Sequence, residues 1–206
     1  MALSAYNSQV FLTAQPSVAL TNEAMTDSGD HKTYTITAQT KRFLDKTVAT
    51  VVQTSPDSTT WTTITTGYTL FRCNARLVFA VANSAGVVAR LASGAYFAVA
   101  LLAEATNCEI APKVETAETT TFSTLGVKTF IPTLLTGIMK TNTFWVSPAR
   151  SQSLVARDLL ACSFVASSGN HYDGYAYASD CNIKADPKAA LTQDLSFQLT
   201  DEFFAA

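Results

Sequence analysis

The segment Val48–Ile64 reads VATVVQTSPDSTTWTTI, and it contains two runs rich in Val and Thr with a turn between them. Val and Thr are branched at Cβ, which favours the extended backbone of a strand over a helix. Between the runs, Pro56 presets the backbone φ of a turn, and the carboxylate of Asp57 can accept bonds from nearby backbone N–H groups. The segment therefore predicts a β-hairpin with strands over Val48–Thr54 and Thr60–Ile64.

Strand patterns continue along most of the chain. Thr33–Thr37 alternates as Thr-Tyr-Thr-Ile-Thr, which places its two apolar residues on one face of a strand. The cleanest alternation lies near the end of the sequence, where Leu195, Phe197 and Leu199 are separated by Ser and Gln. Two shorter strands are predicted between these segments, over Ser163–Ala166 and Gly174–Ser179.

A second hairpin is predicted after the first. Its strands are Gly67–Arg72 and Arg76–Ala80, joined across Asn74–Ala75, where Asn tolerates a left-handed turn conformation. A further strand, Val87–Ala92, follows the next turn. Strands that recur every eight to twelve residues or so, separated by turns, indicate an all-β sandwich or barrel.

The second half of the chain has less regular patterns. Cys108–Thr121 indicates a longer strand and loop, and Gly126–Gly137, which contains Pro132, indicates an irregular link. One amphipathic helix is predicted over Ser151–Ala161, because four apolar residues there make one stripe on a helix. These four residues are Leu154, Val155, Leu159 and Leu160. The predicted fold is mainly β, a sandwich or barrel core with one flanking α-helix, in a single domain over residues 1–206 whose region 21–100 is rich in hairpins.

Composition limits the classes of partner. Hydrophobic residues make up 48% of the chain and charged residues 15%, so much of the surface must consist of uncharged Ser, Thr and Asn. With 14 basic and 16 acidic residues, the formal net charge is -2. A protein that grips phosphates needs a basic surface, so specific nucleic-acid binding is not expected.

Membrane insertion and secretion are not expected either. The N-terminal sequence MALSAYN has no basic segment leading into an apolar run, as a signal peptide would have. The longest apolar stretch, Leu91–Ala103, is shorter than the roughly 20 residues that span a bilayer as a helix. We therefore expect synthesis in the cytoplasm and no transmembrane helix.

No motif for a metal or a cofactor is present in the sequence. The four cysteines are widely spaced and are interpreted as small buried or half-buried residues. His31 and His171 each lie in a turn-like setting, and two histidines in separate loops do not define a metal site. For the second of these clusters, Gly169–Gly174, a Ca²⁺ site or a proton relay is the alternative interpretation.

The sequence also lacks the groups that an enzyme needs. Glycine occurs eight times and never as a run that opens a helix, so no phosphate-binding loop is predicted. Glu115 and Glu118 could be imagined as a glycosidase pair, but no aromatic platform flanks them. Trp61 and Trp145 are interpreted as core or interface anchors. We therefore expect a protein that is not an enzyme.

Several segments of the chain resemble the tail tube proteins of long-tailed bacteriophages. The resemblance begins with TNEAMTD at Thr21–Asp27 and continues with TKRFLD at Thr40–Asp45. It extends through STTWTT at Ser58–Thr63 and RLVFA at Arg76–Ala80 to the threonine-rich strand end ETTTF at Glu118–Phe122. It covers most of the chain as a set of short segments.

The resemblance implies an architecture and a set of partners. Six copies would form a ring through extended hairpins or loops, and rings would stack into a tube between capsid and tail tip. The tube would conduct DNA during ejection without binding it specifically. Other partners would be the tape-measure, tail-terminator and tail-tip proteins. The chain would be a virion tail component made in the cytoplasm of the host bacterium.

Three glutamates are candidates for residues that face the lumen of such a tube. They are Glu109, Glu115 and Glu118, in the region that in the resembled family runs close to the channel. A negatively charged wall would repel DNA and let it slide. The alternative is that these residues lie on a solvated outer surface. For the whole chain, the alternative function is a capsid decoration protein or tail-tip binding module with a β-sandwich fold.

Overall fold

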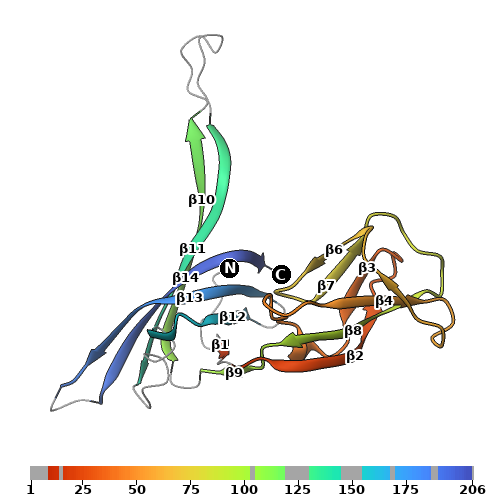
Figure 1. The fold of residues 1–206 in the computed structure, drawn as a ribbon. Coiled ribbons are helices and arrows are strands. Elements are labelled where there is room, and N and C mark those ends of the chain that lie inside the picture. The colour runs from red at the N-terminus through yellow and green to blue at the C-terminus, as the bar shows by residue number, and fades with distance from the viewer. Residues whose placement is uncertain are drawn as a thin grey trace, which may run out of the picture. The chain divides into compact units, whose positions relative to one another are not determined.

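The computed structural model describes residues 9–13, 16–102, 105–118, 130–144, 155–167, 170–186 and 190–205. The chain divides into two compact units. The first unit comprises Met1–Leu102, Leu159–Tyr175 and Glu202–Ala206. The second comprises Ala103–Asp158 and Ala176–Asp201. Figure 1 labels most of the strands, and the fold is mainly β, as the sequence predicts.

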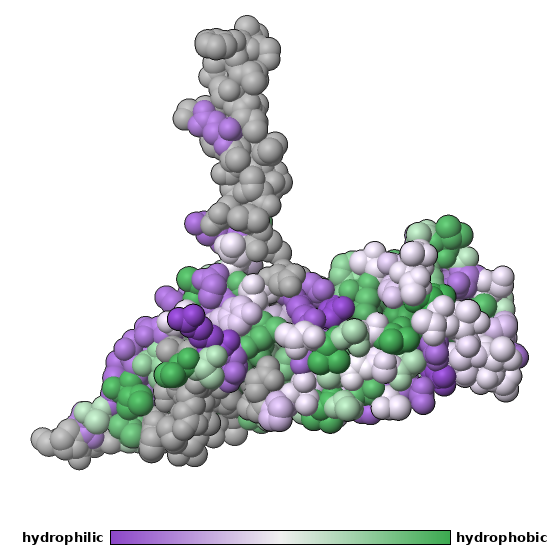
Figure 2. Space-filling model, viewed as in Figure 1, coloured by the Kyte–Doolittle hydropathy of each residue, from purple (hydrophilic) through white to green (hydrophobic). Residues whose placement is uncertain are grey.

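A seven-stranded antiparallel sheet forms the larger part of the first unit (Figure 1). Its strands, in spatial order, are β5 (Thr62–Ile64), β4 (Val51–Ser55), β8 (Val88–Tyr96), β2 (Val18–Asp27), β3 (Thr33–Ile36), β7 (Arg76–Phe79) and β6 (Tyr68–Phe71). Pale residues, the colour of Ser and Thr in Figure 2, cover much of the visible surface of this unit. This agrees with the expectation of a surface rich in uncharged polar side chains.

The hairpin predicted over Val48–Ile64 is confirmed as β4 and β5, which pair in antiparallel register. Asp57 closes its turn, because its Oδ1 atom accepts bonds from the backbone N–H of Thr59 at 2.9 Å and of Thr60 at 2.7 Å. These bonds stabilise the ionised carboxylate and lower the pKa of Asp57. The first strand begins at Val51, three residues later than predicted.

The second predicted hairpin is confirmed as β6 and β7, with one correction in its turn. The left-handed residue is Ala75, with a φ of 45°, whereas the sequence predicts this conformation at Asn74. Ala75 is fully buried, and the backbone N–H groups of Arg72 and Cys73 in the same turn both donate to the Glu202 carboxylate, at 2.5 and 2.9 Å. Contacts that are distant in sequence therefore shape this turn, and local propensity does not determine it.

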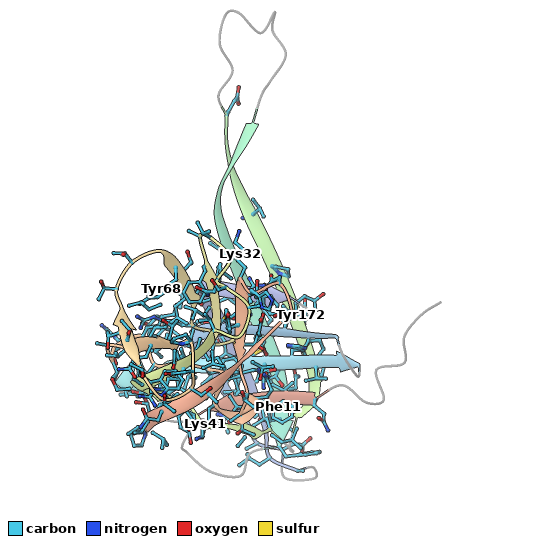
Figure 3. All side chains as sticks on the ribbon, turned by 90° about the vertical axis from the view of Figure 1, so that its right-hand side faces the viewer. Phe11, Lys32, Lys41, Tyr68 and Tyr172 are labelled. Atoms are coloured by element: carbon cyan, nitrogen blue, oxygen red, sulfur yellow. The ribbon has the colours of Figure 1, made fainter. Side chains whose placement is uncertain are left out.

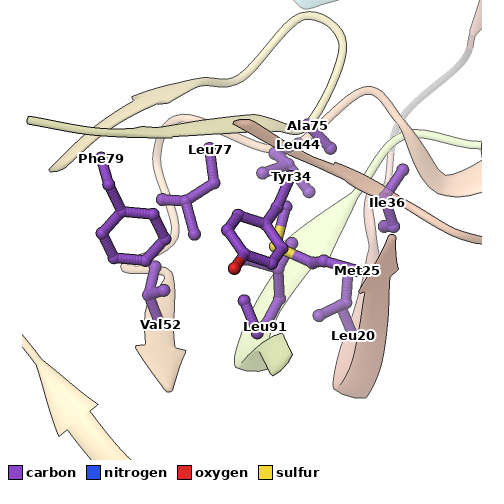
Figure 4. Packing of buried hydrophobic residues seen from close by; sticks show 11 residues of the cluster. Leu20, Met25, Tyr34, Ile36, Leu44, Val52, Ala75, Leu77, Phe79 and Leu91 are labelled. Carbon is purple, nitrogen blue, oxygen red and sulfur yellow. The ribbon is translucent and has the colours of Figure 1, made fainter. Parts of the chain in front are cut away.

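The core of the seven-stranded sheet is a cluster of aliphatic and aromatic side chains (Figure 4). Tyr34 and Ile36 both lie in it, on the apolar face that the alternation of their strand predicts. The Tyr34 ring meets the Phe79 ring edge-on with centroids 5.5 Å apart, and its hydroxyl donates to the Val87 carbonyl at 3.1 Å. A buried phenol needs such a hydrogen-bond partner.

The remaining strands of the first unit belong to the second of the two sheets, which also has seven strands. β1 (Gln9–Thr13) lies between β12 (Leu159–Ser167) and β9 (Val99–Leu101), and the first residues of β13 (Asn170–Lys184) continue the sheet beyond β12. A second core cluster, which includes Phe43, Phe97 and Tyr175, belongs to this part of the unit.

The second unit contains two long strands and parts of two others. Its strands are also part of the second sheet, in the order β10 (Ala105–Glu118), β11 (Phe130–Phe144), β14 (Thr192–Ala205) and β13. β14 pairs with β11 from Gly137↔Leu199 to Phe144↔Thr192. The alternation predicted near the end of the sequence is confirmed, because Leu195, Phe197 and Leu199 of β14 are all buried.

The helix predicted over Ser151–Ala161 is wrong in its C-terminal half. Residues 155 and 156 are helical, but Arg157 has a φ of 57°, and β12 begins at Leu159. Val155 is exposed and Leu160 is buried in β12, so they do not share an apolar helix stripe. A short apolar run fits a buried strand as well as a helix, and periodicity alone does not distinguish them. The first four residues of the expected helix lie outside the described residues.

The irregular link predicted over Gly126–Gly137 is also wrong from Phe130 onward, where β11 begins. Pro132 and Gly137 both lie inside this strand. Proline is tolerated in a strand where its missing N–H faces no partner or where the ladder is irregular. β14 does not flank β11 at Pro132, and a register shift in the β10–β11 ladder lies beside it. Residues 126–129 lie outside the described part of the chain.

Candidate assembly surface

The sheet of the second unit has one buried and one exposed face. Along β11, the side chains of Met139, Thr141 and Thr143 are buried, whereas those of Ile138 and Lys140 are exposed. β14 follows the same alternation, since Leu195 and Phe197 are buried and Gln198 is exposed. A sheet that is buried on one face and solvated on the other gives this period of two.

The exposed face carries charges of both signs in fixed cross-strand positions. Glu109 on β10 lies directly opposite Lys140 on β11, and Lys140 lies opposite Ser196 on β14. Residues directly opposite each other in antiparallel strands share a face, with Cβ atoms about 4.5–5.5 Å apart. The glutamate and the lysine are both exposed. Glu109 therefore has a cation as its cross-strand neighbour.

A second pair of opposite charges lies further along the same sheet. Lys184 on β13 forms an ion pair with Asp194 on β14, and the Asp194 carboxylate also accepts a bond from the Asn142 side-chain amide at 3.0 Å. Asn142 and Asp194 are cross-strand partners. The exposed face is thus a surface of balanced charge at these positions and not a uniformly acidic one.

β10 differs from the other strands at the ends of the two sheets. The end strands β5 and β9 have three residues each and β6 has four, whereas β10 has 14. β11 pairs with one side of β10, and no described strand pairs with the other side. Proteins usually keep edge strands short, because an unpaired row of N–H and C=O groups invites another strand to pair with it.

Beyond Gly137 the sheet narrows to a two-stranded ribbon. The register of β14 with β11 ends at Gly137↔Leu199, while β10 and β11 continue to pair as far as Glu118↔Phe130. Figure 3 shows these two strands crossing as they twist around each other, as two-stranded ribbons do. A ribbon of two strands has little stability of its own in water. Val114 on this ribbon is 52% exposed.

Gly137 lies at the base of the ribbon, where three strands approach one another closely. A Cβ atom at this position would lie 2.8 Å from Leu199 Cδ1 and 3.1 Å from the Ala111 carbonyl oxygen. It would also lie 3.2 Å from Pro112 Cα. Glycine is therefore required here by the space between β10, β11 and β14.

The three glutamates predicted to face a lumen all fall within β10, and the structure places them differently. Glu109 is exposed on the same face as Lys140, and Glu118 is exposed at the far end of the ribbon. Glu115 falls at the register shift between Val114 and Thr116, and its side chain lies outside the described residues. Their assignment to a lumen stays a prediction. Sequence reasoning missed Lys140, which only the strand register brings opposite Glu109.

The first unit contains a buried ionic site that sequence reasoning also missed. Asp173 is fully buried and accepts bonds from Arg42 Nε at 2.9 Å and Arg42 Nη2 at 3.2 Å. Arg42 Nη2 also donates to Ser163 Oγ at 3.1 Å, and His171 Nε2 lies 3.3 Å from Asp173 Oδ2. His171 and Asp173 lie in β13, so the predicted turn at Gly169–Gly174 is wrong from Asn170 onward.

This arrangement fits a structural role better than the Ca²⁺ site or proton relay considered for the same cluster. Both carboxylate oxygens of Asp173 are engaged by a guanidinium group, which is a strong and geometrically specific pairing. Among the residues that the structure describes, no three His, Cys, Asp or Glu side chains gather in a way that could hold a metal ion.

The cysteines agree with the sequence interpretation. Cys73 and Cys162 are buried, and Cys108 and Cys181 are half-buried. Burial raises the pKa of Cys73 to about 12 and that of Cys108 to about 11, so both stay protonated near neutral pH. Within the described ranges, no helix has the length and apolar character needed to cross a membrane.

Comparison with known proteins finds similarity at the level of structure. No protein-family profile matches this chain, and no curated protein sequence matches it. One similar solved structure is a chain from the tail of an empty gene transfer agent particle with C6 symmetry. The match has a TM-score of 0.47 and 8% identity, and it covers 53% of this chain and 87% of that one.

A second similar structure is a chain from the virion of a native gene transfer agent particle. Its TM-score is 0.46, its identity is 8%, and the match covers 52% of this chain and 88% of that one. Both neighbours come from gene transfer agent particles.

Proposed function

We propose that this chain is a structural subunit of a phage tail tube, in which six copies form a ring and stacked rings form the conduit for DNA. The observation that carries the proposal is the open edge of β10. β10 has fourteen residues and pairs with β11 along one side, while the strands at the other ends of the two sheets have three or four residues. A second copy of the chain can supply the missing partner strand.

The physical reason is the hydrogen-bonding capacity of the edge. A strand added to an open edge gains main-chain hydrogen bonds for affinity, and its alternate side chains give specificity. The exposed strand is otherwise a site of uncontrolled aggregation. An edge of this length is therefore better explained by a subunit that assembles with copies of itself than by a monomeric binding module.

The exposed face of the second unit supplies a candidate wall for the conduit. We assign Glu109, Glu115 and Glu118 to the lumen side, with Lys140 opposite Glu109 as a modifying charge. DNA that met only cations would release counterions and adhere to the wall. A wall on which the lysine has an acidic neighbour holds DNA weakly and allows it to slide.

The partners and location of the chain follow from the same proposal. The tube would meet the tape-measure protein in its lumen, the tail-terminator protein at one end and the tail-tip proteins at the other. The chain would then be a virion tail component, synthesised in the host cytoplasm. These assignments rest on the sequence resemblance.

A pair of variants at Ile110 tests the proposal. Pro112 has no N–H, so its nitrogen is expected to face away from β11, toward the open side of β10. Alternate residues of a strand direct their N–H groups to the same side, so the N–H of Ile110 also faces the open side. Both Ile110→Pro and Ile110→Ala remove the isoleucine side chain. Only Ile110→Pro also removes the backbone N–H donor. Electron microscopy of the concentrated proteins should show rings or tubes for wild type and Ile110→Ala but not for Ile110→Pro. Compact single particles of wild type at every concentration would contradict the proposal and favour a decoration or tail-tip module.

A further inference from the structure

Two of the six prolines of the chain lie inside described strands, and both lie on the β10–β11 hairpin. Pro112 interrupts β10, and Pro132 interrupts β11. The two strands are the two sides of the ribbon, so each side carries one proline. Proline is depleted in strands, because it cannot donate to a ladder.

Pro112 lies at the boundary between the three-stranded and two-stranded parts of the sheet. It is the partner of Gly137, the residue at which pairing between β11 and β14 ends. On the Asn107–Ala111 side of this boundary, β10 belongs to a sheet in which β14 pairs with the other edge of β11. On the other side, it has β11 alone as a described partner.

The open edge of β10 loses a donor at this boundary. No register shift occurs between Asn107 and Val114, so alternate residues keep the same orientation. The N–H groups of Cys108, Ile110 and Val114 therefore face the open side, and Pro112 leaves a gap in this row. Lys113, the next residue, is exposed, and charged side chains on an edge also oppose pairing with another strand.

Pro132 has the corresponding place on the other side of the ribbon. It is the partner of Thr116 and lies where β14 does not flank β11. The register shift between Val114 and Thr116 lies beside it, and such irregularities twist an edge away from further partners. Both sides of the ribbon are thus interrupted within a few residues of each other.

We infer that Pro112 and Pro132 protect the ribbon from strand pairing, so that only the Asn107–Ala111 part of β10 joins a second copy of this chain. This inference rests on the proposed function, because it assumes that copies associate through the β10 edge. It adds that the ribbon meets its neighbours through side chains and not through backbone hydrogen bonds. The prolines thereby set the length and the end point of the contact between subunits.

Residue-resolved hydrogen exchange on wild-type protein, before and after assembly, tests the inference directly. The amides of Cys108 and Ile110 should gain protection in the assembled state, and the amide of Val114 should exchange as it does in the unassembled chain. Equal gains at all three amides would overturn the inference while leaving the proposed function intact. Failure of wild type to assemble would overturn both.

A double variant gives an independent test. Pro112→Thr/Pro132→Thr restores two donors on the ribbon, and it should produce irregular aggregates with increased thioflavin T fluorescence and a gain of protection at Val114. Pro56→Thr, in the β4–β5 turn, is the matched control and should assemble as wild type. Regular tubes from the double variant, with Val114 still unprotected, would overturn the inference. If the double variant does not fold, the exchange experiment on wild type decides.

Discussion

Arg42 and Asp173 lie 131 positions apart in the sequence and form a two-point ion pair inside the first unit, at 2.9 and 3.2 Å. Asp173 is fully buried, and the Arg42 side chain is 20% exposed. The pair fastens the segment before Phe43 to β13. Because removing one member of a buried pair leaves the other without compensation, the pair is a sensitive point of the fold.

Arg42→Ala should therefore lower the free energy of unfolding by about 3–5 kcal/mol. Arg42→Lys should recover only part of this loss, because a lysine cannot make the two parallel bonds of a guanidinium group. Urea denaturation measures both variants, and Arg157→Ala, at an exposed position, is the control. Equal stability of Arg42→Ala and Arg157→Ala would show that the pair contributes nothing.

Gly137→Ala should destabilise the second unit by about 1–3 kcal/mol, because the new methyl group overpacks the space between three strands. Its nearest neighbour would be Leu199 Cδ1, at 2.8 Å. Leu199→Ala removes that neighbour, so the double variant should lose less stability than the sum of the two single variants. Thermal unfolding of the four proteins gives the coupling. Strict additivity would mean that Leu199 is not what excludes a side chain at Gly137.

The turn after β2 should make stability depend on pH at the acid end. Bonds from the backbone N–H groups of Thr33 and Lys32 and from the Thr33 hydroxyl lower the pKa of Asp30 from 3.8 to about 2. A lowered folded-state pKa contributes stability that is fully present above the unfolded value, and this contribution is lost as the pH falls through about 2. NMR titration of the Asp30 carboxyl group should show the low value, and Thr33→Val should raise it. An unchanged pKa in Thr33→Val would show that the Thr33 hydroxyl does not contribute to the lowered value.

The opposite charges of Glu109 and Lys140 should determine how strongly the assembled protein binds DNA. Glu109→Gln leaves Lys140 without its acidic neighbour, so binding of short duplex DNA to assembled protein should increase at low salt and weaken as salt is added. Glu109→Gln/Lys140→Gln should return to the weak binding of wild type. Equal DNA binding by all three proteins would show that this face does not meet DNA.

Replacing Glu109, Glu115 and Glu118 together by lysine extends this test to ejection. In a phage that assembles with the variant, an attractive wall should slow genome release at low salt, where screening is weakest. Tube length, measured by electron microscopy, is the control for assembly. Normal ejection from tubes of normal length would remove these three residues from the DNA path.

Local signals in the sequence were sufficient for the hairpins and for the strand with the cleanest alternation. The β4–β5 turn follows from Pro56 and Asp57, and Leu195, Phe197 and Leu199 are buried as their spacing predicts. These features depend on bonds within a few residues, or on a period of two, and both can be read without knowing the rest of the fold.

The errors arose where distant segments decide the structure. Leu160 fits a helix stripe as well as a strand, and pairing of β12 with β1 selects the strand. Pro132 and Gly137 suggest a loop, but β10 provides a partner strand for both. The assembly surface was predictable only as a set of acidic residues. Its open edge and the position of Lys140 opposite Glu109 depend on strand order and register, which composition and periodicity do not encode.

The most direct test of the central claim is a cryo-electron microscopy map of the purified wild-type chain at high concentration. We predict rings or tubes of six copies around an axis, with the Asn107–Ala111 segment of β10 hydrogen-bonded to a strand of the neighbouring copy. A map in which the copies associate while this edge faces solvent, or a sample that stays monomeric at every concentration, would contradict the account.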